Sequence, residues 1–415
     1  MSKMEKGFFD VKKAAGDLQF YTDDQINDFL VDLSYMTEDC SARILEENAR
    51  DLQNMDSLNP KYDRLKLTAE RRSGIAQGIR NVAKLPSPVG VLLDSTVRPN
   101  GMEIKRVSVP FGVVGIIYEA RPNVTLDVFS LCFKSGNACV LKGGSDAYYS
   151  NIALVDIIKE TLKKHNFNEN CVMLLPAGHE STTLMLGARG FIDVLIPRGG
   201  RGLIDYVREN AKIPVIETGA GVCHTYFNSA GDSVIGMMII KNAKTRRVSV
   251  CNALDCLLID RSRLADLPSL CNNLQYDNVK IYADEESFLA MKNFYPENLL
   301  FHAGNDIYGT EFLDYKMAIK VVDGIKEAVG HISRYGSGHS ECIITEDKDA
   351  ADYFQRAVDA ACVYVNVPTS FTDGGEFGLG AEIGISTQKL HARGPMGLKE
   401  LTTYKWIIEG HGQIR

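Results

Sequence analysis

From residue 113 onward the sequence alternates between short apolar runs and amphipathic segments, and this alternation limits the possible folds more than any other feature. Apolar runs of this length, separated by turn residues and helical spacing, indicate buried strands joined by helices. The strands are expected at VVGIIY (113–118), ACVLK (138–142), CVMLLP (171–176), FIDVLIP (191–197) and IPVIE (213–217), with helices over 124–136 and 150–165. Repeated β-α-β units predict an α/β fold with a mostly parallel sheet.

A second series of the same kind follows residue 251. Its strands are expected at LDCLLI (254–259), YKMAIKVV (315–322), ECIIT (341–345) and VYVNV (363–367), with helices over 324–336 and 350–361. A chain of 415 residues exceeds what one hydrophobic core usually serves. We therefore expect two α/β domains with a boundary near residue 240.

Two segments precede these series. Residues 22–54 and 68–84 have helical spacing. Residues 89–109 hold two β-like runs around Asn100-Gly101, a pair that favours a tight type I′ turn because both residues tolerate positive φ. This predicts a hairpin that extends from the domain as an arm.

Composition excludes several classes of function. A net charge of −7 argues against nucleic-acid binding, which needs clustered Lys and Arg. No apolar run approaches the roughly 20 residues that span a bilayer, and the N-terminal segment has no secretory h-region. We expect a cytoplasmic protein without membrane contact.

The ten cysteines show no metal-binding spacing, so no metal ion is expected. Five of them lie inside apolar runs, where a thiol packs like a small hydrophobic residue: Cys132, Cys139, Cys171, Cys342 and Cys362. Cys251 differs because it follows the basic residues Lys244, Arg246 and Arg247, which could stabilise a thiolate. A buried structural thiol remains the alternative, and Cys256, inside an apolar strand, is less suited to catalysis.

Three strand ends carry polar residues that suit a ligand site. In YEARPN (118–123), Asn123 could cap the following helix or direct its amide at an oxyanion. In LKGGSDA (141–147), Lys142 and two glycines could face a phosphate at a helix N-terminus, or form an ordinary turn. In IPRGGRG (196–202), Arg198 and Arg201 could lie near phosphate or simply face solvent.

Together these segments resemble the aldehyde dehydrogenase superfamily and, within it, the glutamate-5-semialdehyde dehydrogenases. The matching stretches are PFGVVGIIYEARPNVT, KSGNACVLKGGSDAYYSN, LIPRGGRGLI, PVIETGAG, NAKTRRVSVCNALDCLLI, RYGSGHSECIITED and the C-terminal GAEIGISTQKLHARGPMGL. They occur in family order over nearly the whole chain. The resemblance implies a cofactor-binding domain (1–88 and 110–240), a catalytic domain (241–370), and an oligomerisation module made of the hairpin (89–109) and the tail (385–415).

The resemblance also implies site residues. The nucleophile falls on Cys251 and the oxyanion-binding amide on Asn123. Cofactor contacts fall on Lys142, Gly143, Ser145, Gly199, Gly200 and Glu311. A serine at 145, where NAD-preferring relatives carry an acid, favours NADP(H). Contacts to the substrate anion are expected from Arg121, His391 and Arg393, with structural ion pairing as the alternative for each.

The implied reaction is the NADPH-dependent reduction of L-glutamyl 5-phosphate to L-glutamate 5-semialdehyde and phosphate through a cysteine thioester, a step of proline biosynthesis. A homo-oligomer and a supplying glutamate 5-kinase are the implied partners. Glu217 has the register of the water-activating glutamate of hydrolytic relatives, but a loop-holding role suits it better here. The chain also has VNVPTSF, with Pro368 and Ser370, where the family usually has VNASTRF, which puts a substrate contact there in doubt.

Three alternatives remain open: an aldehyde dehydrogenase that hydrolyses its thioester, a binding protein that keeps the fold without chemistry, and a cysteine hydrolase. The last needs a base placed beside the nucleophile, and neither His224 nor His391 is placed there by sequence.

Overall fold

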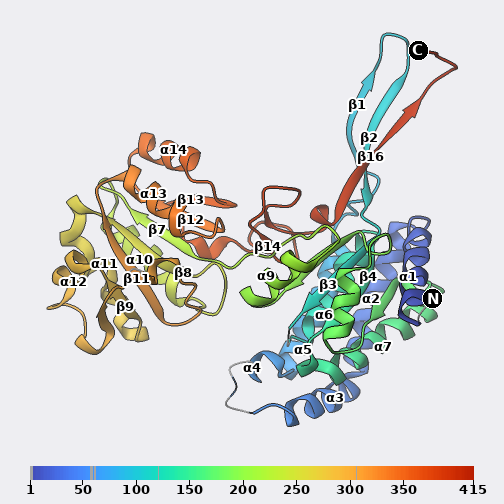
Figure 1. Cartoon of the computed structure of the whole chain (residues 1–415), viewed down its shortest axis with the longest axis horizontal. Coiled ribbons are helices and arrows are strands. Elements are labelled where there is room, and N and C mark those ends of the chain that lie inside the picture. Colours follow the sequence, from blue (N-terminus) through green and yellow to red (C-terminus); the bar gives the residue numbers. More distant parts are fainter. Residues whose placement is uncertain (1–2, 57–58, 60–61, 120, 305) are drawn as a thin grey trace. The chain divides into compact units, whose positions relative to one another are not determined.

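The structure, a computed structural model, describes residues 3–56, 59, 62–119, 121–304 and 306–415. The chain divides into two compact units (Figure 1). One comprises Met1–Thr218, Gly378–Gly384 and Met396–Arg415, and the other comprises Gly219–Phe377 and Ile385–Pro395. The second unit therefore begins before β7 (Cys223–Phe227) and α10 (Ser233–Thr245), whereas the sequence predicted a boundary near residue 240, inside α10. The predicted tail 385–415 is likewise divided between the units.

The first unit contains a four-stranded parallel sheet with the order β5-β4-β3-β6. All six residues of the central strand β3 are buried, as an apolar run between two neighbouring strands requires. Tyr118, the last residue of β3, pairs in register with Gly143 on one side and Arg198 on the other. Three strands thus end at one edge. The strands are β3 (Val113–Tyr118), β4 (Ala138–Gly143), β5 (Val172–Leu174) and β6 (Val194–Arg198).

The prediction of a strand at residues 213–217 is wrong. Val215 makes only an isolated bridge with Leu195. Pro214 has no N–H to donate, so a continued ladder is interrupted at that residue.

Helices of the first unit pack on the sheet and on one another. Helix α2 begins at a capping box in which Thr22 and Gln25 exchange hydrogen bonds, and its buried Ile26, Phe29, Leu30 and Leu33 recur at helical spacing. α1 contacts the sheet, while α2 and α3 contact α7. The helices are α1 (Lys3–Leu18), α2 (Asp23–Asp39), α3 (Ser41–Gln53), α4 (Tyr62–Leu65), α5 (Ala69–Lys84), α6 (Asn123–Lys134), α7 (Tyr148–Lys164), α8 (His179–Leu186) and α9 (Arg201–Asn210).

The predicted hairpin is confirmed, with a different turn. β1 (Leu92–Val97) and β2 (Glu103–Pro110) pair antiparallel, and β16 (Thr402–Glu409) runs along the other edge of β2 (Figure 1). The turn is longer than a type I′ turn: Arg98 exchanges backbone hydrogen bonds with Gly101 and Met102. Gly101 alone of the Asn-Gly pair has positive φ.

The second unit contains a seven-stranded parallel sheet with the order β10-β9-β11-β8-β7-β12-β13. Along β8 the side chains alternate: Leu257 and Ile259 pack in one core cluster, whereas Cys256 and Leu258 pack in the other. The sheet therefore has a hydrophobic core on each of its faces. The strands are β7, β8 (Leu254–Asp260), β9 (Lys280–Ala283), β10 (Leu300–His302), β11 (Lys316–Val322), β12 (Ser340–Ile344) and β13 (Cys362–Val365).

The remaining elements of this unit are helices and one short ladder. β14 (Ile385–Ser386) pairs antiparallel with β15 (Gly394–Pro395). The helices are α10, α11 (Leu267–Cys271), α12 (Glu285–Met291), α13 (Ile325–Tyr335) and α14 (Lys348–Ala357).

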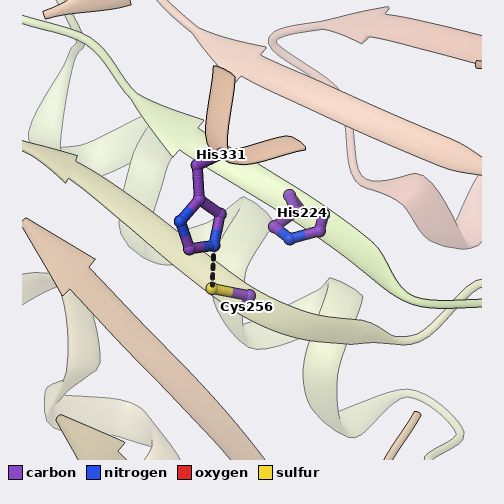
Figure 2. A group of neighbouring side chains, drawn as sticks. All are labelled: His224, Cys256 and His331. Atoms are coloured by element: carbon purple, nitrogen blue, oxygen red, sulfur yellow. Dashed lines mark hydrogen bonds between the residues drawn. The ribbon is translucent and has the colours of Figure 1, made fainter. Parts of the chain in front are cut away.

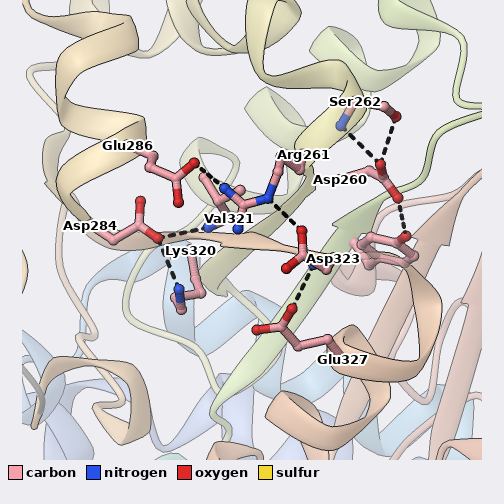
Figure 3. A network of polar contacts seen from close by, with 10 residues as sticks. Asp260, Arg261, Ser262, Asp284, Glu286, Lys320, Val321, Asp323 and Glu327 are labelled. Carbon is pink, nitrogen blue, oxygen red and sulfur yellow. Dashed lines mark hydrogen bonds and ion pairs between the residues drawn. The ribbon is translucent and has the colours of Figure 1, made fainter.

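A polar network occupies the carboxyl ends of β8 and β11 (Figure 3). Arg261 pairs with both Glu286 and Asp323, and Asp284 accepts hydrogen bonds from Lys320 and from the backbone N–H of Val321. These ends, where parallel sheets often bind ligands, are joined here by ion pairs within the unit.

Among the described helices, none combines the length and apolar character needed to cross a membrane.

Candidate active site

Cys251 lies in the turn between α10 and β8, at the amino end of the strand. Its side chain is partly buried, unlike the five cysteines predicted to be structural, all of which are buried. The backbone of Gly221 packs directly on it: a Cβ built on Gly221 would lie 1.6 Å from the carbonyl oxygen of Cys251. The thiol of Cys223 also donates to that oxygen, at 3.2 Å. The turn is thus fixed from the side of residues 221–223.

Glu311 forms a hydrogen bond with the same glycine, Gly221. Its Oε1 accepts the backbone N–H of Gly221 at 2.9 Å, so both Glu311 and Cys251 contact this glycine. The next residue, Phe312, donates its N–H to Asp255 Oδ1 at 3.1 Å. The loop that carries Glu311 is therefore hydrogen-bonded to Gly221, which packs on the turn of Cys251, and to Asp255, which follows that turn.

Lys244 does not face solvent. Its side chain is fully buried, Nζ donates to the carbonyl oxygen of Leu254 at 2.8 Å, and Nζ lies 3.8 Å from Asp255 Oδ1. Burial lowers the pKa of Lys244 and raises the pKa of Asp255 to about 7, although each charge partly offsets the shift of the other. Arg246 and Arg247 are exposed. Of the three basic residues that precede Cys251, only Lys244 is therefore buried in the core.

Asn252, the residue after the nucleophile, is buried and anchors the turn to a distant segment. Its Nδ2 donates to the carbonyl oxygens of Ser370 (3.3 Å) and Thr372 (2.9 Å), and its own carbonyl accepts from Thr369 Oγ1 at 2.8 Å. Ser370 also bonds Asn242 through its hydroxyl. The segment in which this chain departs from the family pattern therefore positions the turn.

Asn123 is the first residue of α6, and its side chain does not cap the helix: the N-cap position is Pro122. Instead, Nδ2 donates to Asp127 Oδ2 at 2.9 Å, one turn along. Burial raises the pKa of Asp127 to about 6, while the bond from Asn123 and the charge of Arg198 act to lower it. An amide has two N–H hydrogens, so one bond to Asp127 orients the group and leaves its second hydrogen for another acceptor.

Lys142 and Gly143 end strand β4. Lys142 is half-buried, and this desolvation lowers its pKa. Gly143 leaves no room for a side chain, because a Cβ there would meet Asn151 Nδ2 at 2.2 Å. Ser145, at the start of the short 3-10 helix before α7, is exposed.

The N-terminus of α7 is already bonded to a carboxylate. Asp51 of α3 accepts the backbone N–H groups of Tyr149 and Ser150 at 3.0 and 2.8 Å. These two backbone N–H groups are therefore already paired within the protein, which leaves Lys142 and the glycines of residues 143–144 as the groups that could face a phosphate.

Gly199 and Gly200 follow β6 and precede α9. The Glu119 side chain lies over them: a Cβ on Gly199 would meet Glu119 Cγ at 2.9 Å, and Gly200 N–H is 3.4 Å from Glu119 Oε2. Arg198 is partly buried, with Gly384 packed against its guanidinium, whereas Arg201 is exposed and pairs with Asp205.

Four residues with less definite expected roles are also placed. Arg121 is exposed at the start of α6. Glu217 pairs with Arg208 at 3.3 Å, as expected of a loop-holding residue. His391 is exposed with φ +68, and Arg393 pairs with Asp359 at 2.7 Å.

Of the two histidines considered as a hydrolase base, His391 is exposed and His224 lies in the core. His224 is fully buried, and its Nδ1 is 3.0 Å from Glu341 Oε2.

The expected site residues are distributed over the two units. The second unit brings Cys251 and Glu311 together and also carries His391 and Arg393. The first unit carries the other expected residues, namely Asn123, Arg121, Lys142, Gly143, Ser145, Gly199 and Gly200. Gly221, Asn252 and Asp255 were missed by the sequence; the one local signal was that Asn252 follows the nucleophile directly.

Curated relatives match the whole chain. A gamma-glutamyl phosphate reductase of Phocaeicola vulgatus is 66% identical over 416 aligned residues, covering 100% of both chains. The chain belongs to the gamma-glutamyl phosphate reductase family. The family member of Bacteroides thetaiotaomicron is 59% identical over 98% of both chains. No family model matches the sequence.

Solved structures agree with this family. The crystal structure of the Thermotoga maritima gamma-glutamyl phosphate reductase is 40% identical, with a TM-score of 0.95 over 100% of both chains. An acetylating aldehyde dehydrogenase of Geobacillus thermoglucosidasius, 15% identical, superposes with a TM-score of 0.70 over 99% of this chain and 97% of its own. The aldehyde dehydrogenase-like fold predicted from the sequence is confirmed.

Proposed function

We propose that this chain reduces L-glutamyl 5-phosphate to L-glutamate 5-semialdehyde and phosphate, the second step of proline biosynthesis from glutamate. The observation that carries the proposal is the full-length match, at 66% identity, to a protein named gamma-glutamyl phosphate reductase. The fixed, partly buried turn that holds Cys251 supports it, because a nucleophile must be both reachable and positioned.

In this proposal the Cys251 thiolate attacks the acyl carbon of the substrate, and the C–O bond to phosphate breaks. The oxyanion that forms at the acyl oxygen needs hydrogen-bond donors, and the resemblance to the family assigns that role to the Asn123 amide and the backbone N–H of Cys251. Such preorganised donors contribute on the order of 3 kcal/mol each. The product is a thioester on Cys251 and free phosphate.

When bound near Lys142, Gly143 and Gly199, NADPH would supply the hydride that reduces the thioester carbonyl. The resulting thiohemiacetal on Cys251 collapses to the aldehyde and restores the thiolate. Glu217 takes no part as a base, because the acyl group leaves by reduction and its pairing with Arg208 suits a structural role.

NADP(H) is the proposed cofactor, and the residues of the first unit suit it. The half-buried Lys142 is a cation at the edge where β3, β4 and β6 end, and Gly143 and Gly199 keep the backbone there free of side chains. Ser145 adds no negative charge of its own near a 2′-phosphate. An engineered glycolyl-CoA reductase with the same fold, 14% identical with a TM-score of 0.69, holds NADP+.

The proposal extends to partners and place. An acyl phosphate is labile, so a glutamate 5-kinase must supply it close by. We place both enzymes in the cytoplasm. The exposed apolar residues of β1 and β16 support self-association through the hairpin and tail, as a homo-oligomer. Arg121, His391 and Arg393 remain the candidates for contact with the substrate anion.

The test is the reverse reaction. Purified protein is mixed with glutamate semialdehyde and NADP+ with and without phosphate, and NADPH is followed by absorbance. We expect phosphate-dependent reduction of NADP+, a lower rate with NAD+, and no turnover in Cys251→Ala.

Equal product with and without phosphate would instead identify a hydrolytic aldehyde dehydrogenase. Unchanged turnover in Cys251→Ala would contradict the assignment of the nucleophile.

A further inference from the structure

Three buried side chains in the second unit form a cluster that the proposed reaction does not use (Figure 2). His224 on β7 and Cys256 on β8 are register partners of neighbouring strands, so their side chains lie on the same face of the sheet. His331 on α13 packs over that face, with its Nε2 3.8 Å from Cys256 Sγ. One ligand atom from each of the three lies within 4.8 Å of the other two.

His224 has a buried nitrogen without a partner among the described residues. Its Nδ1 is paired with Glu341 Oε2, which also accepts the His224 backbone N–H at 2.8 Å. Its Nε2 has no hydrogen bond, although the residue is fully buried. An unsatisfied buried polar atom costs about 1–3 kcal/mol, and such an atom often marks a bound water or ion.

The separation of two of the three ligand atoms is close to that in a zinc site. With Zn–S near 2.3 Å and Zn–N near 2.0–2.1 Å, tetrahedral coordination separates sulfur from nitrogen by about 3.5 Å. The observed separation of Cys256 Sγ and His331 Nε2 is 3.8 Å. A shift of a few tenths of an ångström would bring these two atoms to coordination distance.

The surroundings supply the other requirements of a metal centre. Glu341, also fully buried, fixes the His224 ring through Nδ1, which is how carboxylates commonly orient a metal-binding imidazole. The charges of one divalent cation, one thiolate and one carboxylate sum to zero, so a buried site of this composition carries no net charge.

We propose that His224, Cys256 and His331 form a structural site for one Zn²⁺ ion, which ties β7, β8 and α13 together. Binding releases the proton of Cys256, forms one Zn–S and two Zn–N bonds, and satisfies His224 Nε2. The three ligands come from three separate elements, so no spacing pattern along the chain signals this site.

The test is metal analysis of the full-length protein, expressed with zinc in the medium and purified without a metal-affinity tag. We expect about one zinc ion per chain. Cys251→Ala, which removes the proposed nucleophile as a metal ligand, should keep the zinc. Cys271→Ser, a buried thiol of the same unit that lies outside the cluster, is the matched control and should keep it too.

Cys256→Ser and His331→Gln should each reduce zinc content by about tenfold or more. If these variants do not fold, X-ray absorption of the Cys251→Ala protein decides the question, with one sulfur near 2.3 Å and nitrogens near 2.0–2.1 Å expected around zinc. Folded wild-type protein without zinc, zinc retained in Cys256→Ser, zinc lost in Cys251→Ala, or a coordination shell without sulfur would each overturn the proposal.

Discussion

At Gly221 the backbone passes so close to Cys251 that no side chain fits between them. We expect Gly221→Ala to lower kcat by about 100-fold or more, because displacing a nucleophile by about 1 Å costs that much. Steady-state kinetics and the melting temperature should be compared with Gly330→Ala, an exposed glycine of α13 with open space around it. A Gly221→Ala enzyme within about twofold of the parent would show that this contact does not set the nucleophile's position.

The protonation of Asp127 should make the activity depend on pH. Asp127, with a pKa raised to about 6, is ionised above that pH and then accepts the Asn123 amide. Its help in orienting Asn123 is present at high pH and is lost as the pH falls through about 6. We expect kcat/KM to show this acid limb, and Asp127→Asn to lower kcat/KM at pH 8 and to remove the limb.

Asp127→Asn should not weaken the fold at pH 8. A carboxyl whose pKa rises on folding costs stability as the pH climbs from its unfolded pKa to its folded one, and the variant removes that cost. Asp146→Asn, an exposed acid, is the matched control and should leave the pH profile unchanged. An acid limb that persists in Asp127→Asn would assign it to another group.

The sequence predicted site residues that lie in a local motif, but it did not predict residues whose role depends on contacts with distant parts of the chain. Cys251 and Lys142 stood out because ordered motifs surround them. Gly221 and Asp255 matter because they touch residues far along the chain, such as Phe312, and no spacing in the sequence signals such a contact. The capping alternative for Asn123 failed because the helix begins one residue earlier than its motif suggested.

Among the elements, the segment around Ser370 acts as a clamp on the turn that precedes β8. Asn252→Ala leaves the Ser370 and Thr372 carbonyl oxygens without their donor, which should cost about 1–3 kcal/mol of stability. Because the nucleophile is adjacent, we expect kcat to fall by about tenfold or more with little change in KM.

Urea unfolding and steady-state kinetics measure these two effects. Asn272→Ala, at an exposed residue of the same unit, is the control that should change neither. A rise in KM at constant kcat would mean that Asn252 acts on substrate binding instead of on the nucleophile.

The sequence predicted long elements better than short or interrupted ones. The strands β8, β11 and β12 were found because each is a largely buried apolar run bounded by turns, and β13 was found from its apolar run although only Cys362 in it is buried. β9 and β10 have only four and three residues, too few for a periodic pattern. At 213–217 an apolar run suggested a strand, but Pro214 limited it to one bridge.

Exposed apolar residues on β1 and β16 predict that the whole protein assembles with other copies of itself. Tyr404, Trp406 and Ile408 lie on one face of β16 and are about half exposed, and Leu92 and Val97 of β1 are also exposed. Apolar residues on strands at the edges of a sheet favour pairing with another chain. We expect the protein to be a homo-oligomer, and Trp406→Lys to shift it toward smaller species in light scattering coupled to gel filtration.

Phe294→Lys, at an aromatic residue of the second unit that is 66% exposed against 52% for Trp406, should leave the mass unchanged and serves as the control. A parent protein that is monomeric at micromolar concentration would contradict the prediction.

The pairing of β2 with β16 has a further consequence for how the protein is made. Lys105 and Glu409, which form an ion pair across these strands, are 304 positions apart. On the ribosome, β2 is therefore translated long before its neighbour exists, and the nascent chain carries an unpaired strand edge throughout synthesis of the second unit. During that interval the exposed edge is open to pairing with other chains, which favours aggregation.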